Sequence, residues 1–377
     1  MTVSVESTSN GTGGGTGNAK APSQPRLYSS GSLDGFKSTV LTPVIGNEFP
    51  KGSINIVDDI LNAPNAEDRI RDLAILIAER GVVFFRAQGN LTNDLQKELI
   101  LKLGELTGRP KEHGLHIHPV VNDAREFGDP DPQISTINSL ERKKLYKGAY
   151  GKLAAIWHSD ISFEKAPSDF SALRLTLLPP TGGDTLWASG YELYDRISKP
   201  YREFLETLTA RHAGDGFHRA AEAGGFGLYE KPRGSPLNVG SELASDHPIV
   251  RTNPITGWKS IFPVEYGQTA LTATTGTFPK KVNGLTTRES ENLLKYFHDL
   301  ITYGHDLQVR FKWNEPNDIA IWDNRSVFHT ATFDYDGIGE RSGNRAVGIG
   351  EVPYLDRASK SRREDLGIED QLSLVHL

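Results

Sequence analysis

Seven short segments with the composition of β-strands follow one another between residues 172 and 350, and they constrain the fold more than any other feature. They are ALRLTLL (172–178), DTLWA (184–188), HPIVRT (247–252), LQVRFKW (307–313), DIAIWD (318–323), VFHTAT (327–332) and RAVGIG (345–350). Helical patterns interrupt them near 191–211 and 286–301. This succession favours a mostly-β fold, a β-sandwich or jelly roll with outer helices. A Rossmann fold does not fit, because strands and helices do not alternate regularly and no GxGxxG follows a strand.

The N-terminal part of the chain adds two amphipathic helices and a buried strand. Apolar residues from Ile70 to Ile77 recur at helical spacing, and Asn65 is the expected N-cap of that helix. The apolar segment VVFFR (82–86) predicts a buried strand, and a second helix is expected at 91–106 with Thr92 as its cap. Residues 1–30 are mostly Gly, Ser, Thr, Asn and Pro, which predicts a disordered tail before a single domain at 31–377.

Composition excludes several classes of function. The chain has no cysteine, so disulfides, thiolate zinc sites, iron–sulfur clusters and cysteine nucleophiles are absent. A net charge of −6 gives no general attraction to nucleic acid or anionic membrane. No apolar run reaches the about 18 residues of a transmembrane helix. The N-terminus has no apolar signal region and Lys20 is its only cation before residue 26, so we expect a cytoplasmic protein.

The segment IWHSDISFE (156–164) places a histidine and an aspartate two residues apart in a strand-like pattern. In a strand, His158 and Asp160 share one face and Ser159 lies on the other. An imidazole and a carboxylate on one face supply two of the three ligands of the 2-His-1-carboxylate site of non-haem Fe(II) oxygenases. His329, in WDNRSVFHTATF, is the best candidate for the third ligand.

Other histidines are weaker candidates for that third ligand. His298 is expected on a helix, His212 after one, and His376 near the C-terminus. The segment HGLHIHPV (113–120) offers a rival pair, His116 and His118, although no third ligand with an obvious spacing lies nearby.

Two arginines and a threonine have the chemistry of an anion site. Arg341 and Arg345 lie four residues apart at the start of an apolar strand, so they are expected on the same side. The planar guanidinium group binds carboxylates and sulfonates through two parallel hydrogen bonds. Thr185 follows two glycines in GGDTLW, and its hydroxyl can donate to a carboxylate. Solvated arginines at a strand edge and an ordinary turn are the alternatives.

Taken together in their order along the chain, these segments resemble the taurine dioxygenase family of Fe(II)- and 2-oxoglutarate-dependent dioxygenases, including fungal sulfonate dioxygenases. The resemblance covers roughly residues 40–352. It is carried by GVVFFR, HIHPV, WHSDISF, LPPTGGDTLWAS, HPIVRTNPITG, NDIAIWDNRSVFHTA and the closing arginine pair.

The resemblance implies a double-stranded β-helix core of the cupin-like jelly-roll type, with Fe(II), 2-oxoglutarate and O2 as cofactors. It implies iron ligands at His158, Asp160 and His329. Thr185 and Arg341 would hold the distal carboxylate of 2-oxoglutarate. His118 and Arg345 would bind the anionic head of a small organic substrate. A homo-oligomer is also expected.

Two departures from the taurine-specific pattern indicate a roomier, less polar pocket. Val121 replaces a tyrosine and Ala154 replaces an asparagine. A longer alkylsulfonate or a sulfate ester would fit, with sulfite or sulfate and an aldehyde as products beside succinate and CO2. The alternatives are a hydroxylase of a carboxylate, aryloxyacid, purine or natural product, a non-catalytic jelly roll, and a zinc hydrolase. Residues 219–242 have the composition of a lid or of a long surface loop, and Phe262 and Tyr266 are possible pocket walls.

Overall fold

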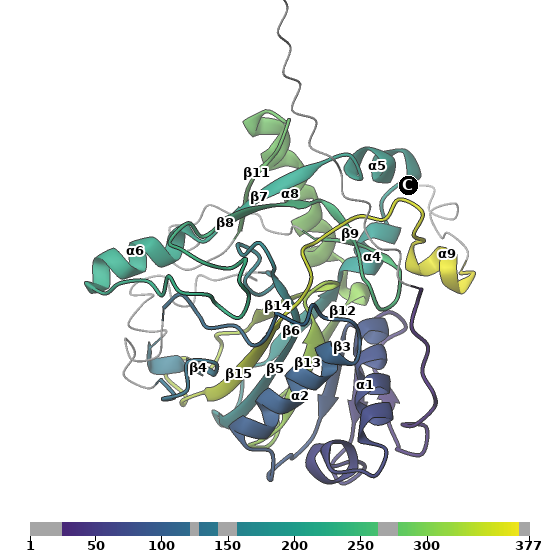
Figure 1. The fold of residues 1–377 in the computed structure, drawn as a ribbon, viewed down its shortest axis with the longest axis vertical. Coiled ribbons are helices and arrows are strands. Elements are labelled where there is room, and N and C mark those ends of the chain that lie inside the picture. The colour runs from purple at the N-terminus through teal and green to yellow at the C-terminus, as the bar shows by residue number, and fades with distance from the viewer. Residues whose placement is uncertain (1–24, 121–127, 142–156, 263–277, 369–377) are drawn as a thin grey trace, which may run out of the picture.

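Two β-sheets form the centre of the molecule, and helices lie outside them (Figure 1). The computed structural model describes residues 25–120, 128–141, 157–262 and 278–368. The large sheet has the strand order β1-β2-β3-β13-β5-β15-β4, and all its neighbours are antiparallel except β2 and β3. Its strands are β1 (Thr39–Val40), β2 (Asn47–Phe49), β3 (Val82–Phe85), β4 (Ser135–Asn138), β5 (Ser168–Leu177), β13 (Ile319–Asp323) and β15 (Ser342–Ile349).

A small antiparallel sheet, in the order β12-β6-β14, packs against the large one. Its strands are β6 (Thr185–Ser189), β12 (Gln308–Phe311) and β14 (Val327–Ala331). Two further small sheets pair β7 (Thr209–Ala213) with β8 (Ala244–Pro248) and β11 (Phe278–Val282), and β9 (Val250–Thr252) with β10 (Lys259–Ile261).

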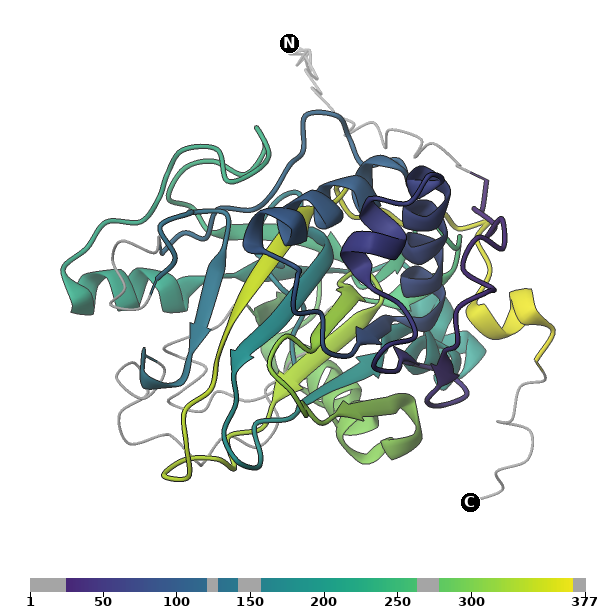
Figure 2. The same ribbon diagram turned by 90° about the horizontal axis from the view of Figure 1, so that it is seen from below.

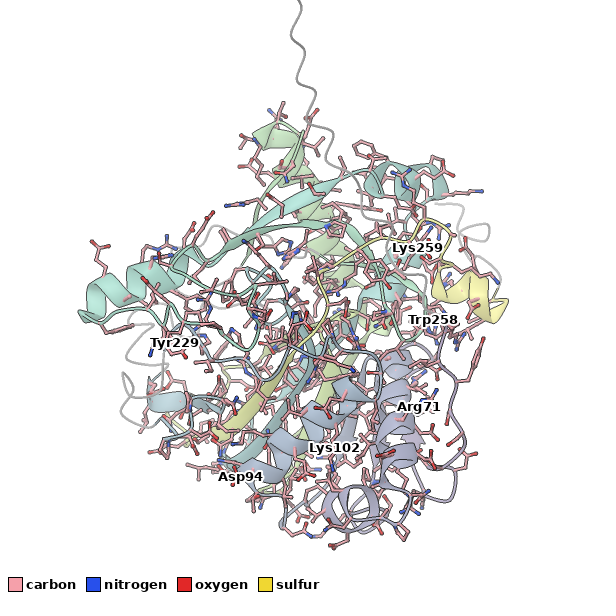
Figure 3. All side chains as sticks on the ribbon, in the orientation of Figure 1. Arg71, Asp94, Lys102, Tyr229, Trp258 and Lys259 are labelled. Carbon is pink, nitrogen blue, oxygen red and sulfur yellow. The ribbon has the colours of Figure 1, made fainter. Side chains whose placement is uncertain are left out.

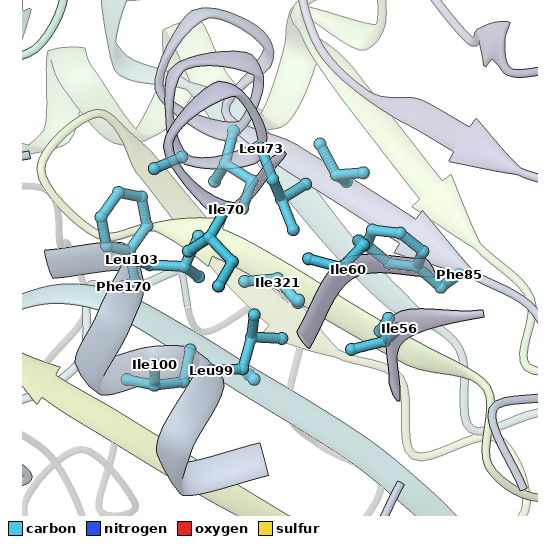
Figure 4. Packing of buried hydrophobic residues seen from close by; sticks show 14 of the residues in the cluster. Ile56, Ile60, Ile70, Leu73, Phe85, Leu99, Ile100, Leu103, Phe170 and Ile321 are labelled. Atoms are coloured by element: carbon cyan, nitrogen blue, oxygen red, sulfur yellow. The ribbon is translucent and has the colours of Figure 1, made fainter. Parts of the chain in front are cut away.

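Successive apolar side chains of the central strands point to opposite faces of the large sheet, and both faces are therefore buried. On β13, Ile319 and Ile321 point to the helices, whereas Ala320 and Trp322 point to the small sheet. The helical side includes α1 (Ala66–Arg80), α2 (Asn93–Glu105) and a π-helix (Ile56–Leu61), and both α-helices lie on the same side of the strands in Figure 2. Figure 4 shows side chains from all three packed on strand residues such as Phe85 and Ile321. The space between the sheets is filled by aromatic residues, including Phe84, Trp187, Phe311, Trp313 and Trp322.

The remaining helices of the described residues are α4 (Gly190–Asp195), α5 (Lys199–Leu205), α6 (Asp215–Gly224), α8 (Thr287–Tyr303), a 3-10 turn (His305–Leu307) and α9 (Arg362–Leu366). The helical region predicted near 191–211 contains two helices, α4 and α5, and its end belongs to a strand instead. Pro200, at the start of α5, lacks the N–H needed to continue α4, and the last residues of the prediction pair as β7. The predicted strand at 247–252 is likewise divided between β8 and β9. No helix in the described ranges is long and apolar enough to cross a membrane.

Two other sequence predictions concern the N-terminal part. Thr92 caps α2 by accepting from the Leu95 N–H at 3.3 Å, as expected, but the Asn65 side chain makes no capping hydrogen bond. Residues 1–24 of the predicted tail lie outside the described residues. Two residues of the predicted tail that are described make tertiary contacts: Arg26 pairs with Glu79, and the Ser30 N–H donates to the Asp72 carboxylate.

Candidate metal centre

His158 and His329 face each other across two antiparallel segments. His329 is the central residue of β14, and the two histidines exchange backbone hydrogen bonds of 3.1 and 2.9 Å. Their ring centroids lie 4.2 Å apart, and the His329 ring also contacts Trp322 between the two sheets. The strand expected at 156–164 is only partly right. His158 forms an isolated bridge, and a turn begins at Asp160, where Ile161 has a left-handed φ of 48°.

Asp160 is held from several sides at the start of this turn. Its Oδ2 accepts from the Ser171 hydroxyl at 3.0 Å, and its N–H donates to the Asn324 side-chain oxygen at 3.1 Å. Its Oδ1 accepts from the Arg345 guanidinium at 2.5 Å and lies 3.8 Å from His329 Nε2. Sequence analysis did not assign a role to Ser171 or Asn324. The only signal was that Asn324 lies in the family-like segment WDNR.

The three side chains fit a divalent first-row metal ion. One ligand atom each from His158, Asp160 and His329 lies within 4.8 Å of the other two, and no other such group occurs among the described residues. Two imidazoles and one carboxylate are the donor set of non-haem Fe(II) sites. Burial raises the pKa of Asp160, but attraction by Arg345, His329 and His158 outweighs it and holds that pKa below its usual value. The carboxylate is therefore ionised and ready to bind a cation.

A second polar group lies around Thr185, at the start of β6. Its hydroxyl oxygen accepts from Trp313 Nε1 at 3.1 Å and from Arg341 Nη2 at 3.2 Å. A hydroxyl has two acceptor positions, so both are used and its hydrogen is free to donate elsewhere. Arg341 also donates to the Gly183 carbonyl at 2.9 Å. The two glycines before Thr185 are required by positive φ angles of 80° and 74° at Gly182 and Gly183. This arrangement can present one hydroxyl and one guanidinium to a carboxylate.

The two arginines expected on one side serve different groups. Arg341 lies at Thr185, whereas Arg345, in β15, pairs with Asp160. The Arg345 side chain is 15% exposed, and its Nε is buried without a hydrogen-bond partner in the described part of the chain. A buried donor left unpaired is costly, which makes this atom a candidate contact for an anion.

His116 and His118 do not form a rival metal site with any third ligand in the described ranges. His116 Nε2 instead lies 3.2 Å from Glu164 Oε1. Burial, only partly offset by Glu164, lowers the pKa of His116, so its ring is neutral. The His118 ring packs edge-on against Phe217 at 4.8 Å, and its Nδ1 accepts from the Val120 N–H at 3.1 Å.

The other weak candidates lie elsewhere. The ring of His212 packs against His247 at 5.2 Å and against the buried Phe262 at 5.4 Å. His298 is on α8 beside Thr302. Four residues discussed above fall outside the described residues: Val121, Ala154, Tyr266 and His376.

A cavity of about 520 Å³ lies on the outer face of the small sheet. Its lining includes Leu186 and Thr330, which alternate along their strands with Thr185 and His329. Neighbouring residues of a strand point to opposite faces. This cavity is therefore separated from the metal ligands by the sheet itself.

Comparison with known proteins gives a consistent family. Residues 37–347 match the model of the family described as taurine catabolism dioxygenase TauD, TfdA family. The chain is 46% identical to alpha-ketoglutarate-dependent dioxygenase btcD of Neocamarosporium betae, over 90% of this chain and 97% of that protein. It is 29% identical to the alpha-ketoglutarate-dependent sulfonate dioxygenase of Saccharomyces cerevisiae, over 88% and 71%. A taurine dioxygenase from Burkholderia xenovorans aligns with a TM-score of 0.58 at 25% identity, over 85% and 91%.

Proposed function

The chain belongs to the TauD/TfdA family and is an Fe(II)- and 2-oxoglutarate-dependent dioxygenase, and we propose that it hydroxylates the carbon next to a sulfonate or sulfate ester group. The hydroxylated product would release sulfite or sulfate and leave an aldehyde. Fe(II) held by His158, Asp160 and His329 would, together with O2 and 2-oxoglutarate, supply the oxidising power, with succinate and CO2 as the coproducts. The two facing sheets support a jelly-roll core for this enzyme.

In this proposal His158, Asp160 and His329 hold the iron. The hydroxyl of Ser171 donates to the Asp160 carboxylate and the side-chain oxygen of Asn324 accepts from the Asp160 N–H, and these two bonds fix the orientation of the Asp160 segment. The bound cosubstrate would be oriented by Arg341 and Thr185. Preorganised positioning of this kind removes part of the entropic barrier to reaction.

The observation that carries the substrate class is the position of Arg345. One guanidinium nitrogen contacts Asp160, a proposed iron ligand, while the buried Nε has no partner among the described residues. A substrate anion that accepts from Arg345 would therefore lie beside the metal, with its adjacent carbon close to the oxidant. His118 would be a second contact for the anionic head. The similarity to a sulfonate dioxygenase is consistent with this choice.

A second candidate is hydroxylation of a carboxylate or a natural product. It is favoured by the 46% identity to a fungal dioxygenase whose name specifies no sulfonate. Arg345 would bind a carboxylate through the same donors.

The two candidates are separated by one assay. Enzyme is reconstituted anaerobically with Fe(II) and 2-oxoglutarate, mixed with oxygen, and tested on alkylsulfonates, alkyl sulfate esters and carboxylates of matched chain length. The proposal expects substrate-dependent succinate together with sulfite or sulfate. Succinate formed with carboxylates alone would overturn the sulfur substrate and favour the second candidate.

A further inference from the structure

Three segments meet at one buried carboxylate that the reaction does not use. The ligand turn (residues 160–164) begins at Asp160 and ends at Glu164. The strap (residues 113–120) carries His118, and the loop (residues 229–240) follows α6. Figure 3 labels Tyr229 on this loop, on the same side of the molecule as α6. Glu164, four residues after Asp160, is only 2% exposed.

The side chain of Glu164 binds the loop through Arg233. Nε and Nη2 of Arg233 donate to the two carboxylate oxygens of Glu164 at 2.5 and 2.9 Å. The remaining nitrogen, Nη1, donates to the carbonyls of Tyr229 and Gly240 at 3.0 and 2.8 Å. Arg233 is 1% exposed, so this guanidinium closes the loop at both ends from inside the protein.

The same carboxylate binds the strap through His116. Its Nε2 lies 3.2 Å from Glu164 Oε1, and the neutral ring donates this hydrogen bond. Burial raises the pKa of Glu164, but His116 and Arg233 hold it below its usual value, so the pair with Arg233 is charged. His116 is two residues from His118, and its N–H donates to the Val347 carbonyl in β15 at 2.8 Å.

Backbone contacts join the loop to the strap directly. The Tyr229 N–H donates to the Pro119 carbonyl, and the Gly114 N–H to the Gly234 carbonyl, both at 2.8 Å. Gly234 has a φ of +82°, and a side chain there would place Cβ 2.3 Å from the Leu115 carbonyl oxygen. The loop is therefore docked on the strap at its start and its middle.

The ligand turn is also fixed from its other side. His247 Nε2 lies 2.9 and 3.0 Å from the carbonyl oxygens of Ser162 and Glu164, so its N–H donates to both. Phe163 packs on Phe217, which contacts the His118 ring. Each end of Glu164, backbone and side chain, thus has a defined partner.

We propose that Glu164 is a positioning residue for the organic substrate, because it sets the strap and the loop relative to the ligand turn. This inference rests on the proposed function in that His118 is the strap residue proposed to contact substrate. Arg341 and Thr185 lie outside the three segments, so the binding of 2-oxoglutarate should not depend on Glu164.

Glu164→Gln tests the proposal, because it keeps the size of the side chain and removes the charge that holds Arg233. Misplacing a binding group by about 1 Å can cost about 100-fold in rate, so kcat/KM for the organic substrate should fall roughly 10- to 100-fold, through a higher KM. KM for 2-oxoglutarate should stay near the wild-type value, and more succinate should form per molecule of substrate oxidised. Hydrogen exchange should increase at the amides of Gly114, Tyr229 and Gly240 and remain unchanged in α1.

Arg233→Met should reproduce these effects, and Arg86→Met is the matched control. Arg86 is a half-buried arginine that also binds carboxylates, those of Glu48 and Asp318, outside the three segments. Loss of the Arg86 guanidinium should lower the stability of the fold. It should not raise hydrogen exchange locally at Gly114, Tyr229 and Gly240, and it should not raise KM for the organic substrate relative to KM for 2-oxoglutarate. An unchanged substrate KM in Glu164→Gln, or faster exchange spread evenly over the chain, would overturn the inference.

Failure of the proposed function is a separate result. If the wild-type enzyme oxidises a carboxylate and releases no sulfite or sulfate, the sulfur substrate is excluded. The role of Glu164 would then be decided with that carboxylate as substrate. The measurements are the same: KM for the carboxylate compared with KM for 2-oxoglutarate, and hydrogen exchange in the strap and the loop.

Discussion

Replacing Thr185 by valine tests whether this hydroxyl holds the cosubstrate. Valine has nearly the same shape, so the change removes one hydroxyl and leaves the packing of β6 in place. In the wild type, Trp313 and Arg341 occupy both acceptor positions of the hydroxyl oxygen. Its hydrogen would therefore be available to the distal carboxylate of 2-oxoglutarate.

Two magnitudes follow from these contacts. A hydrogen bond to a charged group contributes about 1.5–3 kcal/mol, so KM for 2-oxoglutarate should rise roughly 10- to 150-fold. The valine also leaves the buried Trp313 N–H without an acceptor, which costs about 1–3 kcal/mol of folding free energy. Arg341 keeps its bond to Gly183 and should remain in place.

The assay is succinate formation as a function of 2-oxoglutarate concentration, together with denaturant unfolding. Thr185→Ser is the control, because it keeps the hydroxyl and should bind 2-oxoglutarate with near wild-type affinity. A wild-type KM for 2-oxoglutarate in Thr185→Val, in a folded variant, would refute the assignment of Thr185 to the cosubstrate.

Four further predictions follow from single contacts. Asp160→Asn should lose bound iron and turnover, as measured by metal analysis and succinate formation; retention of both would exclude it as a ligand. Arg345→Ala should raise KM for the organic anion strongly while KM for 2-oxoglutarate changes little, and the reverse pattern would exchange the roles of the two arginines. Gly234→Ala should lose at least about 2 kcal/mol of folding free energy, from the left-handed φ and the blocked Cβ position. Gly240 also has a left-handed φ, of +86°, but an added Cβ would meet no atom there. Gly240→Ala should therefore lose less folding free energy in denaturant unfolding, and equal losses in the two variants would argue against the blocked contact at Gly234. Burial lowers the pKa of His247 from 6.5 to about 4. As pH falls below 6.5, this histidine is therefore protonated in the unfolded chain before it is protonated in the folded protein. The free energy of unfolding should therefore fall by up to about 3 kcal/mol between pH 7 and 4. His247→Gln should make this fall smaller in denaturant titrations, and an equal fall in the wild type and the variant would contradict the prediction.

The sequence predicted the elements that are marked by a local apolar run. The strands β3 and β13 were recognisable because they are apolar on both faces, and their residues do divide between the helical core and the aromatic layer between the sheets. The helical region expected at 191–211 is divided, because Pro200 cannot donate the backbone hydrogen bond that would join α4 to α5, and its last residues pair as β7. Asn65 does occupy the N-cap position of α1, but its side chain makes no capping hydrogen bond, because a residue type that favours capping does not ensure that bond.

In the site, too, the sequence predicted residues that local motifs mark, and it did not predict contacts that only the tertiary fold creates. His158 and Asp160 do meet His329, although the turn at Asp160 replaces the strand from which their convergence was predicted. The contact of Arg345 with Asp160 joins residues 185 apart in the chain, and no local pattern could have indicated it. The Glu164 cluster was missed for the same reason, since His116 and Arg233 come from separate segments and only the fold brings them together.

The most direct test of the central claim is a crystal structure grown without oxygen in the presence of Mn(II), as a substitute for Fe(II), and 2-oxoglutarate. Anomalous diffraction locates the metal without assumptions about its ligands. We expect one manganese ion bound by His158, Asp160 and His329, with the distal carboxylate of 2-oxoglutarate on Thr185 and Arg341. Manganese bound elsewhere, or 2-oxoglutarate held away from these two residues, would contradict the account.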